Sequence, residues 1–296
     1  MNALTGRKIN TVFVFALFTV PALAAIFLSV LVPFFMSIIY SFTKWNGLDK
    51  VPVFIGLSNY KELIFDDPEM VSSLFFTLRL TFLTVIFTNT IALTLAVFLD
   101  SDINGKNFLR AAFYIPHIVS LIVIGYIWKF IFTSGFDSLY NLLKWKIFQQ
   151  SWLGDGDIAF VSVAMVSVWQ AIGFYMVIYI AGLQTVPKEL MEASMIDGAS
   201  PLRRFFRITL PMIMPSVTVC VFYSLSNGLK AFDVIFSLTN GGPGTATMSI
   251  ALDIYRTAFI ISRFGYGTAK SVVLFLTILL LTFFQIKAFK RREVEL

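Results

Sequence analysis

The sequence is poor in cysteine, histidine and charged side chains. Its single cysteine, Cys220, excludes an internal disulfide framework. One cysteine and one histidine also cannot make a His/Cys metal cluster. Charged residues make up 14% of the 296-residue chain. A typical soluble domain has about 25%, so the charged side chains are too few to cover a soluble fold of this length.

The sequence is instead rich in apolar side chains. Hydrophobic residues make up 57% of the chain, and 33 residues are Phe. This composition excludes intrinsic disorder and indicates an integral membrane protein in a lipid bilayer. The net charge of +6 does not indicate a nucleic-acid partner, because the basic residues are dispersed near the ends of apolar runs, where they orient a membrane protein.

Six apolar runs are long enough to cross a bilayer, which takes about 20 helical residues. They lie at about 11–41, 72–99, 111–133, 158–184, 211–238 and 268–289. The predicted fold class is therefore an all-α integral membrane protein, with residues 1–296 as one domain. Pro21 and Pro33 are expected to kink the first run, which is longer than an upright span needs. Its Ala22-Leu23-Ala24 resembles a signal-peptidase site, but the apolar run continues well past it, which favours an uncleaved first span.

Lysine and arginine are denser in the connections on one side of the six runs. Eleven lie in segments 1–10, 100–110, 185–210 and 290–296, and seven lie in the longer segments 42–71, 134–157 and 239–267. Because cytoplasmic loops carry the excess of basic residues, the first group and both termini are predicted to be cytosolic.

Motifs for catalysis are missing from this sequence. Residues 265–271 (GYGTAKS) come nearest to a phosphate-binding loop, but Ala269 stands where a glycine must let backbone N–H groups approach phosphate. His117 has no partner motif and is expected to be packed or hydrogen-bonded. A membrane-embedded enzyme would need several titratable groups within the spans. A passive channel would need pore symmetry from an oligomer.

The long connection at 185–210 predicts a short cytosolic helix. Pro187 suits the first helical turn, and Glu189 and Glu192 suit its positive N-terminal end. Gly198 can end the helix in a left-handed conformation, and Pro201 prevents its continuation. Composition leaves two interpretations open: a helix that docks on a partner, and an amphipathic helix that lies on lipid.

The same stretch resembles the EAA loop of permease subunits in binding-protein-dependent ABC importers. The matching residues are Glu192-Ala193-Ser194, Asp197-Gly198-Ala199 and Ile208-Thr209-Leu210-Pro211, where Ser194 replaces an alanine of the family pattern. The resemblance implies that this helix couples the permease to an ATPase. The residues implied in that coupling are Glu189, Glu192, Ala193, Ser194, Asp197, Gly198 and Ala199.

Further segments resemble the carbohydrate branch of that family. They are FIGLSNY at 54–60, IWKFIF at 127–132, TNGGPGTATMSIALDIYRTAF at 239–259 and FGYGTAKS at 264–271. The chain is most similar to first permeases of the maltose and glycerol-phosphate types, and the motifs do not separate these two substrate groups.

The resemblance implies a type I importer fold with six transmembrane helices in the cytoplasmic (inner) membrane of a prokaryote. It implies a second homologous permease, two ATPase subunits and an extracytoplasmic solute-binding protein as partners. It further implies no cofactor on this chain, since ATP and Mg²⁺ are bound by the ATPase. An importer of this kind would carry a sugar or oligosaccharide by alternating access.

Two runs carry polar and aromatic residues that predict a sugar path. In the fifth, Ser224, Ser226, Asn227, Gly228 and Lys230 are expected to break the helix within the membrane, where polar groups are costly unless paired or facing a cavity. In the fourth run, rings alternate with hydrogen-bonding groups. The predicted substrate path consists of Trp169, Phe174, Tyr175, Ser224 and Asn227. The alternative is that these polar groups join helices to one another.

Two cations within the apolar runs are not expected to touch substrate. Arg79 and Lys129 have long stems that can carry their charges to a membrane interface.

Overall fold

The computed structural model describes residues 3–101 and 103–290, with side chains from residue 13 onward. The chain forms two compact units. The first contains residues up to Asp66 together with Ile254–Val273, and the second contains Asp67–Asp253 together with the chain from Leu274. Of the eleven basic residues on which the predicted cytosolic placement of both termini rests, those at 7, 8, 291 and 292 lie outside the described side chains.

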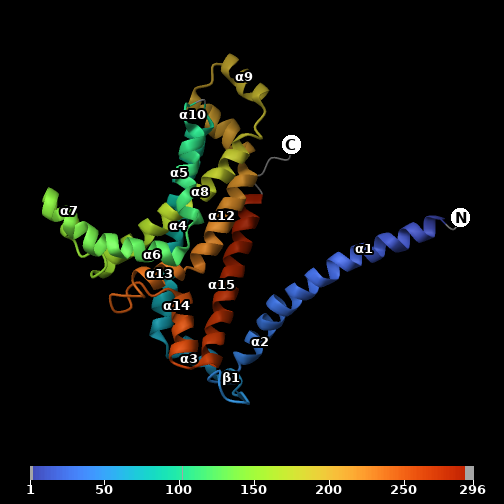
Figure 1. The fold of residues 1–296 in the computed structure, drawn as a ribbon, viewed down its shortest axis with the longest axis vertical. Coiled ribbons are helices and arrows are strands. Elements are labelled where there is room, and N and C mark those ends of the chain that lie inside the picture. Colours follow the sequence, from blue (N-terminus) through green and yellow to red (C-terminus); the bar gives the residue numbers. More distant parts are fainter. Residues whose placement is uncertain (1–2, 102, 291–296) are drawn as a thin grey trace. The chain divides into compact units, whose positions relative to one another are not determined.

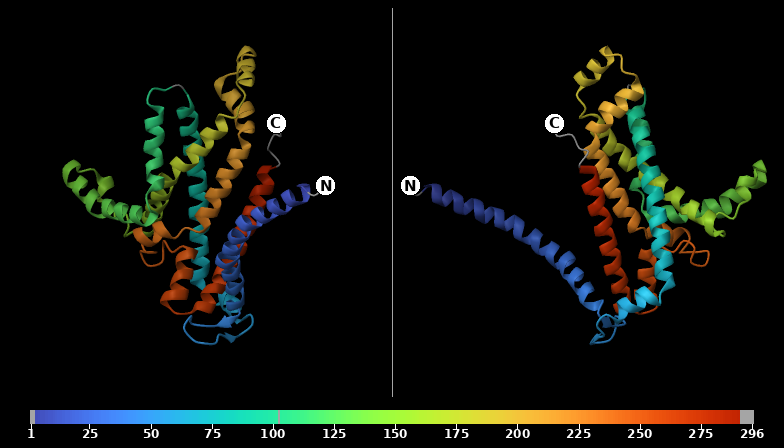
Figure 2. Two further views of the ribbon diagram at one scale, coloured as in Figure 1. Left: turned by 45° about the vertical axis from the view of Figure 1, so that its right-hand side comes forward. Right: turned by 180° about the vertical axis from the view of Figure 1, so that it is seen from behind.

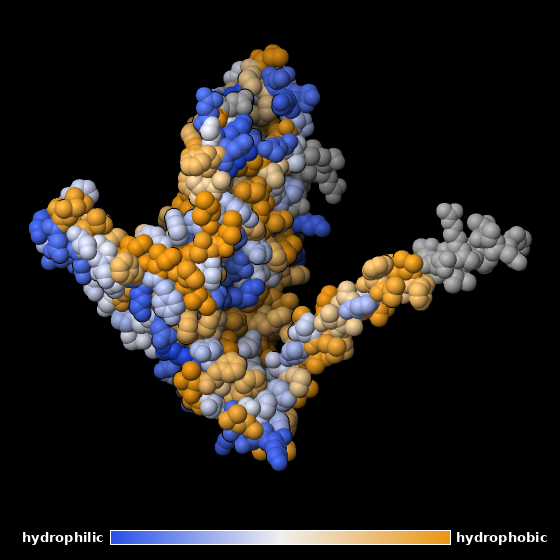
Figure 3. Space-filling model, viewed as in Figure 1, coloured by the Kyte–Doolittle hydropathy of each residue, from blue (hydrophilic) through white to orange (hydrophobic). Residues whose placement is uncertain are grey.

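The first unit begins with one long helix made of α1 (Ala3–Ile26), the π-turn η1 (Phe27–Leu31) and α2 (Val32–Tyr40). Pro21 lies inside α1, and Pro33 follows the π-turn. The Val32 N–H bonds to the Phe27 carbonyl, so the helix widens just before a proline that lacks an N–H. From Phe13 onward, most side chains of this helix are apolar (Figure 3), and none of its most apolar stretch is buried. A helix apolar on all sides requires lipid or a partner around it.

After this long helix, the first unit continues as a small folded loop. Strands β1 (Thr43–Lys44) and β2 (Val53–Phe54) pair antiparallel, and α3 (Ser58–Phe65) follows them. The buried Asn59 side chain donates hydrogen bonds to the carbonyls of Ser41 and Thr43. Arg263 forms a bidentate ion pair with Glu62, at 2.6 and 2.7 Å.

The second unit is a bundle built on α4 (Pro68–Asp100), α5 (Lys106–Ile118), α8 (Gly156–Leu183) and α12 (Met214–Leu229) (Figure 1). Figure 2 shows α5 running back alongside α4. Its core contains the small residues Ala92 and Ala96 of α4 against Met176 and Tyr179 of α8. Because small side chains let helix backbones approach closely, α4 and α8 pack along much of their length.

The remaining elements of the second unit are short. They are α6 (Leu121–Phe130), η2 (Ile131–Gly135), α7 (Phe136–Leu143), η3 (Lys146–Gln149), α9 (Lys188–Ile196), α10 (Pro201–Arg204), η4 (Phe205–Thr209), α11 (Leu210–Met212), α13 (Asp233–Leu238) and most of α14 (Ile250–Tyr255). The π-turn η5 (Arg256–Ile260) lies in the first unit, and the last helix, α15 (Phe264–Lys290), contributes to both.

The all-α membrane fold class is confirmed. Five described helices are long and apolar enough to cross a membrane, and a sixth span is obtained if one bent pair is counted. For the predicted spans 72–99, 158–184 and 268–289, the helices are α4, α8 and α15. Helices α4 and α15 are each about five residues longer than predicted, and α8 has nearly the predicted bounds. The first span extends over Phe13–Tyr40.

The third predicted span, 111–133, differs from the structure. The helix ends at Ile118, Val119 is extended, and a new helical stretch begins at Leu121 and continues to Leu143. Pro116 lies inside the last turn of α5 and cannot supply the N–H that this turn needs, which weakens the helix just before the break.

The fifth predicted span, 211–238, is divided into three pieces. A 72° bend separates residues 201–212 from α12. The expected polar break lies later than predicted: Ser224, Ser226 and Asn227 remain helical, and α12 ends at Leu229. After Lys230, residues 231 and 232 are non-helical, and α13 follows.

Candidate functional site

The connection after α8 folds into the short helix that the sequence predicted. Helix α9 begins after Pro187 and ends before Asp197, and Gly198 adopts φ +71°. The Gly198 N–H bonds to the Met195 carbonyl, and the Ala199 N–H bonds to the Ser194 carbonyl, both at 3.0 Å. This pair of bonds is the Schellman arrangement, which needs a left-handed residue after the helix and therefore favours glycine.

Most of α9 is exposed, and its acids are free. Glu189, Glu192 and Asp197 are exposed, and their carboxylates form no ion pair with residues that the structure describes. Ile196 is 88% exposed beside them. Met195, next to Ile196, is 54% exposed as well. Neighbouring exposed apolar side chains among unpaired acids are typical of a docking face, and Figure 1 shows α9 projecting beyond the bundle helices of its unit.

The other implied coupling residues differ in exposure. Ala193 and Gly198 are exposed, and Ala199 is half-buried. Ser194 is buried, and its hydroxyl donates to the Met191 carbonyl at 2.7 Å. Ser194 therefore faces inward, on the side of α9 opposite the free carboxylates, and its hydroxyl bonds within the helix itself.

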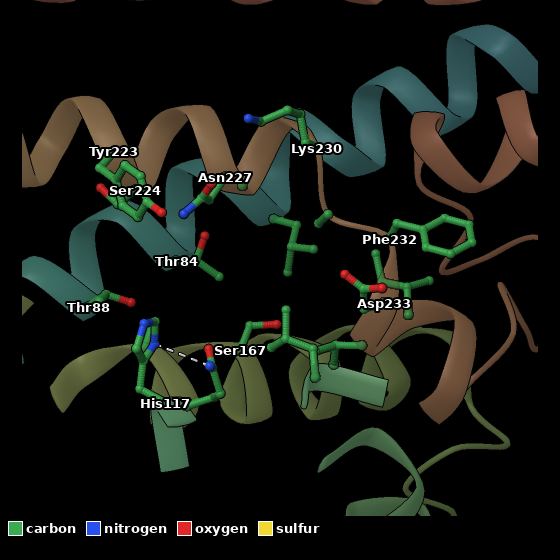
Figure 4. Close-up of a pocket in the computed structure, with 18 of the residues that line it drawn as sticks. Thr84, Thr88, His117, Ser167, Tyr223, Ser224, Asn227, Lys230, Phe232 and Asp233 are labelled. Atoms are coloured by element: carbon green, nitrogen blue, oxygen red, sulfur yellow. Dashed lines mark hydrogen bonds between the residues drawn. The ribbon is translucent and has the colours of Figure 1, made fainter. Parts of the chain in front are cut away.

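A cavity of about 380 Å³, lined by both apolar and polar side chains, lies among the helices of the bundle (Figure 4). Residues of α4, α5, α6, α8, α12 and α13 line it, together with the turn at 230–232. Hydroxyl and amide groups share its wall with the rings of Tyr175 and Tyr223. The polar and charged lining residues outside these rings are Thr84, Thr88, His117, Ser167, Gln170, Ser224, Asn227, Lys230 and Asp233. Its volume lies within the range of about 300–1,000 Å³ usual for small-molecule sites.

Three of the five predicted substrate-path residues reach this cavity. Tyr175, Ser224 and Asn227 line it. Phe174 does not, but its ring stacks on His117 at 4.7 Å and so supports the wall. Trp169 is 42% exposed and its ring contacts Trp128 instead, outside the cavity lining.

Sequence reasoning missed the contribution of α4 and α13. Thr84 and Thr88 are four residues apart, so they share one face of α4, and this spacing within an apolar run was the available signal. Asp233 was not considered because its element was assumed to continue the fifth span. His117 is hydrogen-bonded as predicted, with 3.3 Å between its Nδ1 and the Gln170 amide nitrogen, and it also lines the cavity.

Three side chains beside the cavity form a hydrogen-bonded chain across three helices. The Tyr179 hydroxyl donates to the Asn89 amide oxygen at 2.7 Å, and the Asn89 amide nitrogen donates to the Ser224 hydroxyl at 2.9 Å. The Ser224 hydroxyl in turn donates to the Val221 carbonyl at 3.1 Å. Ser224 thus joins helices and lines the cavity at once, and its hydroxyl can offer a solute only an acceptor.

The cations Arg79 and Lys129 lie outside the cavity lining. Arg79 places its guanidinium 4.2 Å from the centre of the Phe160 ring, and Lys129 is exposed. Neither position supports substrate contact, in agreement with the sequence-based expectation.

A helical membrane bundle that encloses a cavity with polar groups and carries a capped, exposed helix on a loop has the features of a membrane permease. The chain belongs to the family of binding-protein-dependent transport system inner membrane components, whose model matches residues 89–294. It is thus an integral membrane component of a transport system that works with a solute-binding protein.

Individual relatives match nearly the whole chain. It is 40% identical to the probable starch degradation products transport system permease protein AmyD of Thermoanaerobacterium thermosulfurigenes, over 95% of both chains. It is 35% identical to the multiple sugar-binding transport system permease protein MsmF of Streptococcus mutans, over 88% of this chain and 90% of the relative. It shares the fold of a bacterial ABC transporter involved in import of the acidic polysaccharide alginate, with a TM-score of 0.82, 20% identity and coverage of 97% and 98%.

Proposed function

We propose that this chain is the sugar-translocating permease subunit of an ATP-driven importer. The observation that carries the proposal is the combination, in one unit, of a cavity suited to sugar and an exposed helix suited to an ATPase. Relatives whose names refer to starch degradation products and to multiple sugars support the substrate class.

The cavity supplies both kinds of contact that a sugar needs. Tyr223 is 43% exposed, so its ring can cover an apolar C–H face of a pyranose, whereas the buried Tyr175 lines the wall beside it. The amides of Gln170 and Asn227 can donate to and accept from its hydroxyls. Trp169 lies outside the cavity lining. Of the five residues that the sequence predicted for the substrate path, Tyr175, Ser224 and Asn227 are the proposed contacts.

Helix α9 is proposed as the coupling helix. Its exposed residues Glu189, Glu192, Ala193, Asp197 and Gly198 would seat in a cytosolic ATPase, which binds ATP and Mg²⁺. Binding of ATP to the ATPase would favour one orientation of the cavity, and hydrolysis followed by product release would favour the opposite orientation. The cavity would thus open to the two sides of the membrane in turn. A second, homologous permease would complete the path, and two ATPase subunits would bind below.

The proposed orientation places both termini and α9 in the cytosol of a prokaryotic cell. The solute-binding protein would then deliver sugar from the outside. A passive channel gives α9 no role. Glycerol phosphate remains the second candidate solute, because Lys230 could attract a phosphate within the cavity.

The proposal is tested by purifying the tagged chain from its native host and identifying the proteins retained. We expect an ATPase and a second permease. Proteoliposomes containing this complex, with its binding protein added, should accumulate labelled maltotriose or raffinose only when ATP is supplied. Accumulation that is independent of ATP, or purification without an ATPase, would contradict the proposal.

A further inference from the structure

Two opposite charges face the cavity, and both are free. Lys230 and Asp233 are the charged residues of its lining, and they flank the break between α12 and α13. Neither side-chain charge has a hydrogen-bond or ion-pair partner among the residues that the structure describes. Figure 4 shows the Asp233 carboxylate turned toward the middle of the cavity, with Lys230 at its edge.

The rest of the wall carries no formal charge. Its other polar groups are hydroxyls, amides and one imidazole, and no arginine is found in the described lining. An anionic solute is usually held by several cations or by a bidentate arginine. One lysine accompanied by a carboxylate does not provide that environment, because the carboxylate repels the anion that the lysine attracts.

A neutral polyhydroxylated solute can use both charges. A carboxylate accepts hydrogen bonds from two neighbouring hydroxyls, and an ammonium donates to a hydroxyl or ring oxygen. Hydrogen bonds with one charged partner are about twice as strong as neutral ones. A neutral sugar therefore gains from Asp233 and Lys230 together, whereas a phosphate or uronate gains from only one of them.

We propose that Asp233, balanced by Lys230, makes the translocation cavity selective for neutral sugars over anionic solutes such as glycerol phosphate or uronic-acid oligosaccharides. This selectivity rests on the proposed sugar-import function and assigns its substrate class. Asp233 is thus a specificity residue that acts by repulsion as well as by hydrogen bonding.

The first test measures the electrostatic potential in the cavity without using any sugar. Ser167 lines the cavity and its hydroxyl bonds only within its own helix, so Ser167→Cys is a mild change. In the complete importer with Cys220→Ala, the cysteine is labelled with sulfonatoethyl methanethiosulfonate, an anion, and with its trimethylammonioethyl counterpart, a cation. The ratio of the two rates cancels differences in access and in thiol reactivity.

The ratio of anionic to cationic labelling rates should rise about tenfold in Asp233→Asn and fall by a similar factor in Lys230→Gln. Asp233→Glu should leave it unchanged. Ratios that stay within about twofold of the parent in both neutralised variants would show that these charges do not set the potential of the cavity, and would overturn the proposal. Each variant has its own expected direction of change in the labelling ratio. If one variant fails to assemble, the other therefore still tests the proposal.

The second test measures transport by the same importer with its binding protein. The probes are maltotriose and raffinose, which are neutral, and glycerol 3-phosphate and digalacturonate, which are anionic. ATP-driven uptake should be confined to neutral probes. Equal or faster uptake of an anionic probe would overturn the selectivity while leaving the importer function intact. Absence of ATP-driven uptake for every probe would contradict the proposed function for these solutes. The labelling ratio would still show whether Asp233 sets the potential of the cavity.

Discussion

At the scale of single residues, the cavity separates side chains that meet a solute from those that only lie nearby. Asn227→Ala should raise the half-saturating sugar concentration about 2–12-fold, since it removes roughly 0.5–1.5 kcal/mol of hydrogen bonding. Tyr175→Ala should raise it at least as much, because it removes a ring of the cavity wall as well as a hydroxyl. Trp169→Ala is the matched control, because this large ring lies on the same helix as Tyr175 but outside the cavity lining. Uptake by reconstituted importer checks this. An effect of Trp169→Ala as large as that of Tyr175→Ala would contradict the assigned path.

The chain of hydrogen bonds from Tyr179 through Asn89 to Ser224 should act as a unit. Tyr179→Phe removes the donor that orients the Asn89 amide, and so loosens the Ser224 hydroxyl. We expect Tyr179→Phe to weaken sugar uptake in the parent but hardly at all in Ser224→Ala, with a coupling energy of about 0.5 kcal/mol or more. Half-saturating concentrations of the two single variants and the double variant give this value. Effects that add to within about 0.3 kcal/mol would mean that the three residues act independently.

At the scale of elements, α5 and α8 approach each other through a glycine. A Cβ at Gly173 would lie 2.1 Å from the Phe113 carbonyl oxygen, which is backbone and cannot turn aside. Gly173→Ala should therefore push α5 away and lower the stability of the permease by about 1–3 kcal/mol. Gly135→Ala is the control, because its nearest neighbours would be 3.8 Å away. Thermal unfolding of the two variants in the same detergent compares them. Equal melting temperatures would show that this approach is not constrained.

Elements defined by local chemistry could be predicted from the sequence. Helix α9 has its start and end set by Pro187, Gly198 and Pro201, and each acts on its own backbone. The corner at Val119 was not predicted, although Pro116 one turn earlier was an available signal, because neither Val119 nor Ser120 is a residue that breaks a helix strongly. The apolar run continues across that corner, so hydrophobicity alone indicates one span.

The site was predictable only in part for a related reason. Helix α8 is apolar on nearly all sides, so the sequence does not show which face meets the cavity. From the sequence, Tyr175 and Trp169 are therefore equally good candidates for the cavity wall. Only the packing of the helices shows that Tyr175 lines the cavity and Trp169 does not. Asp233 belongs to the cavity because the chain turns after Lys230, which depends on contacts far away in the sequence.

At the scale of the whole molecule, the density of basic residues predicts which side of the membrane each loop faces. Ser200 and Thr245 are both exposed, so each suits a single cysteine in a Cys220→Ala background. An impermeant maleimide applied to intact cells should label Thr245→Cys and leave Ser200→Cys unlabelled until the membrane is opened. Labelling of Ser200→Cys in intact cells would reverse the orientation.

The central claim is that α9 links this permease to ATP hydrolysis. Glu192→Lys reverses a free, exposed charge on the docking face, and Gly198→Asp adds a charged side chain at the left-handed position after it. Asp137→Lys is the control, since Asp137 is exposed on α7, away from this face. None of these substitutions touches the cavity.

The most direct test measures sugar uptake and ATP hydrolysis together in proteoliposomes containing the complete importer and its binding protein. Glu192→Lys and Gly198→Asp should each abolish uptake, with weaker retention of the ATPase or loss of its stimulation by loaded binding protein, whereas Asp137→Lys should behave as the parent. Normal coupled uptake in both α9 variants would show that this helix is only a surface helix, and would contradict the account of how the permease is driven.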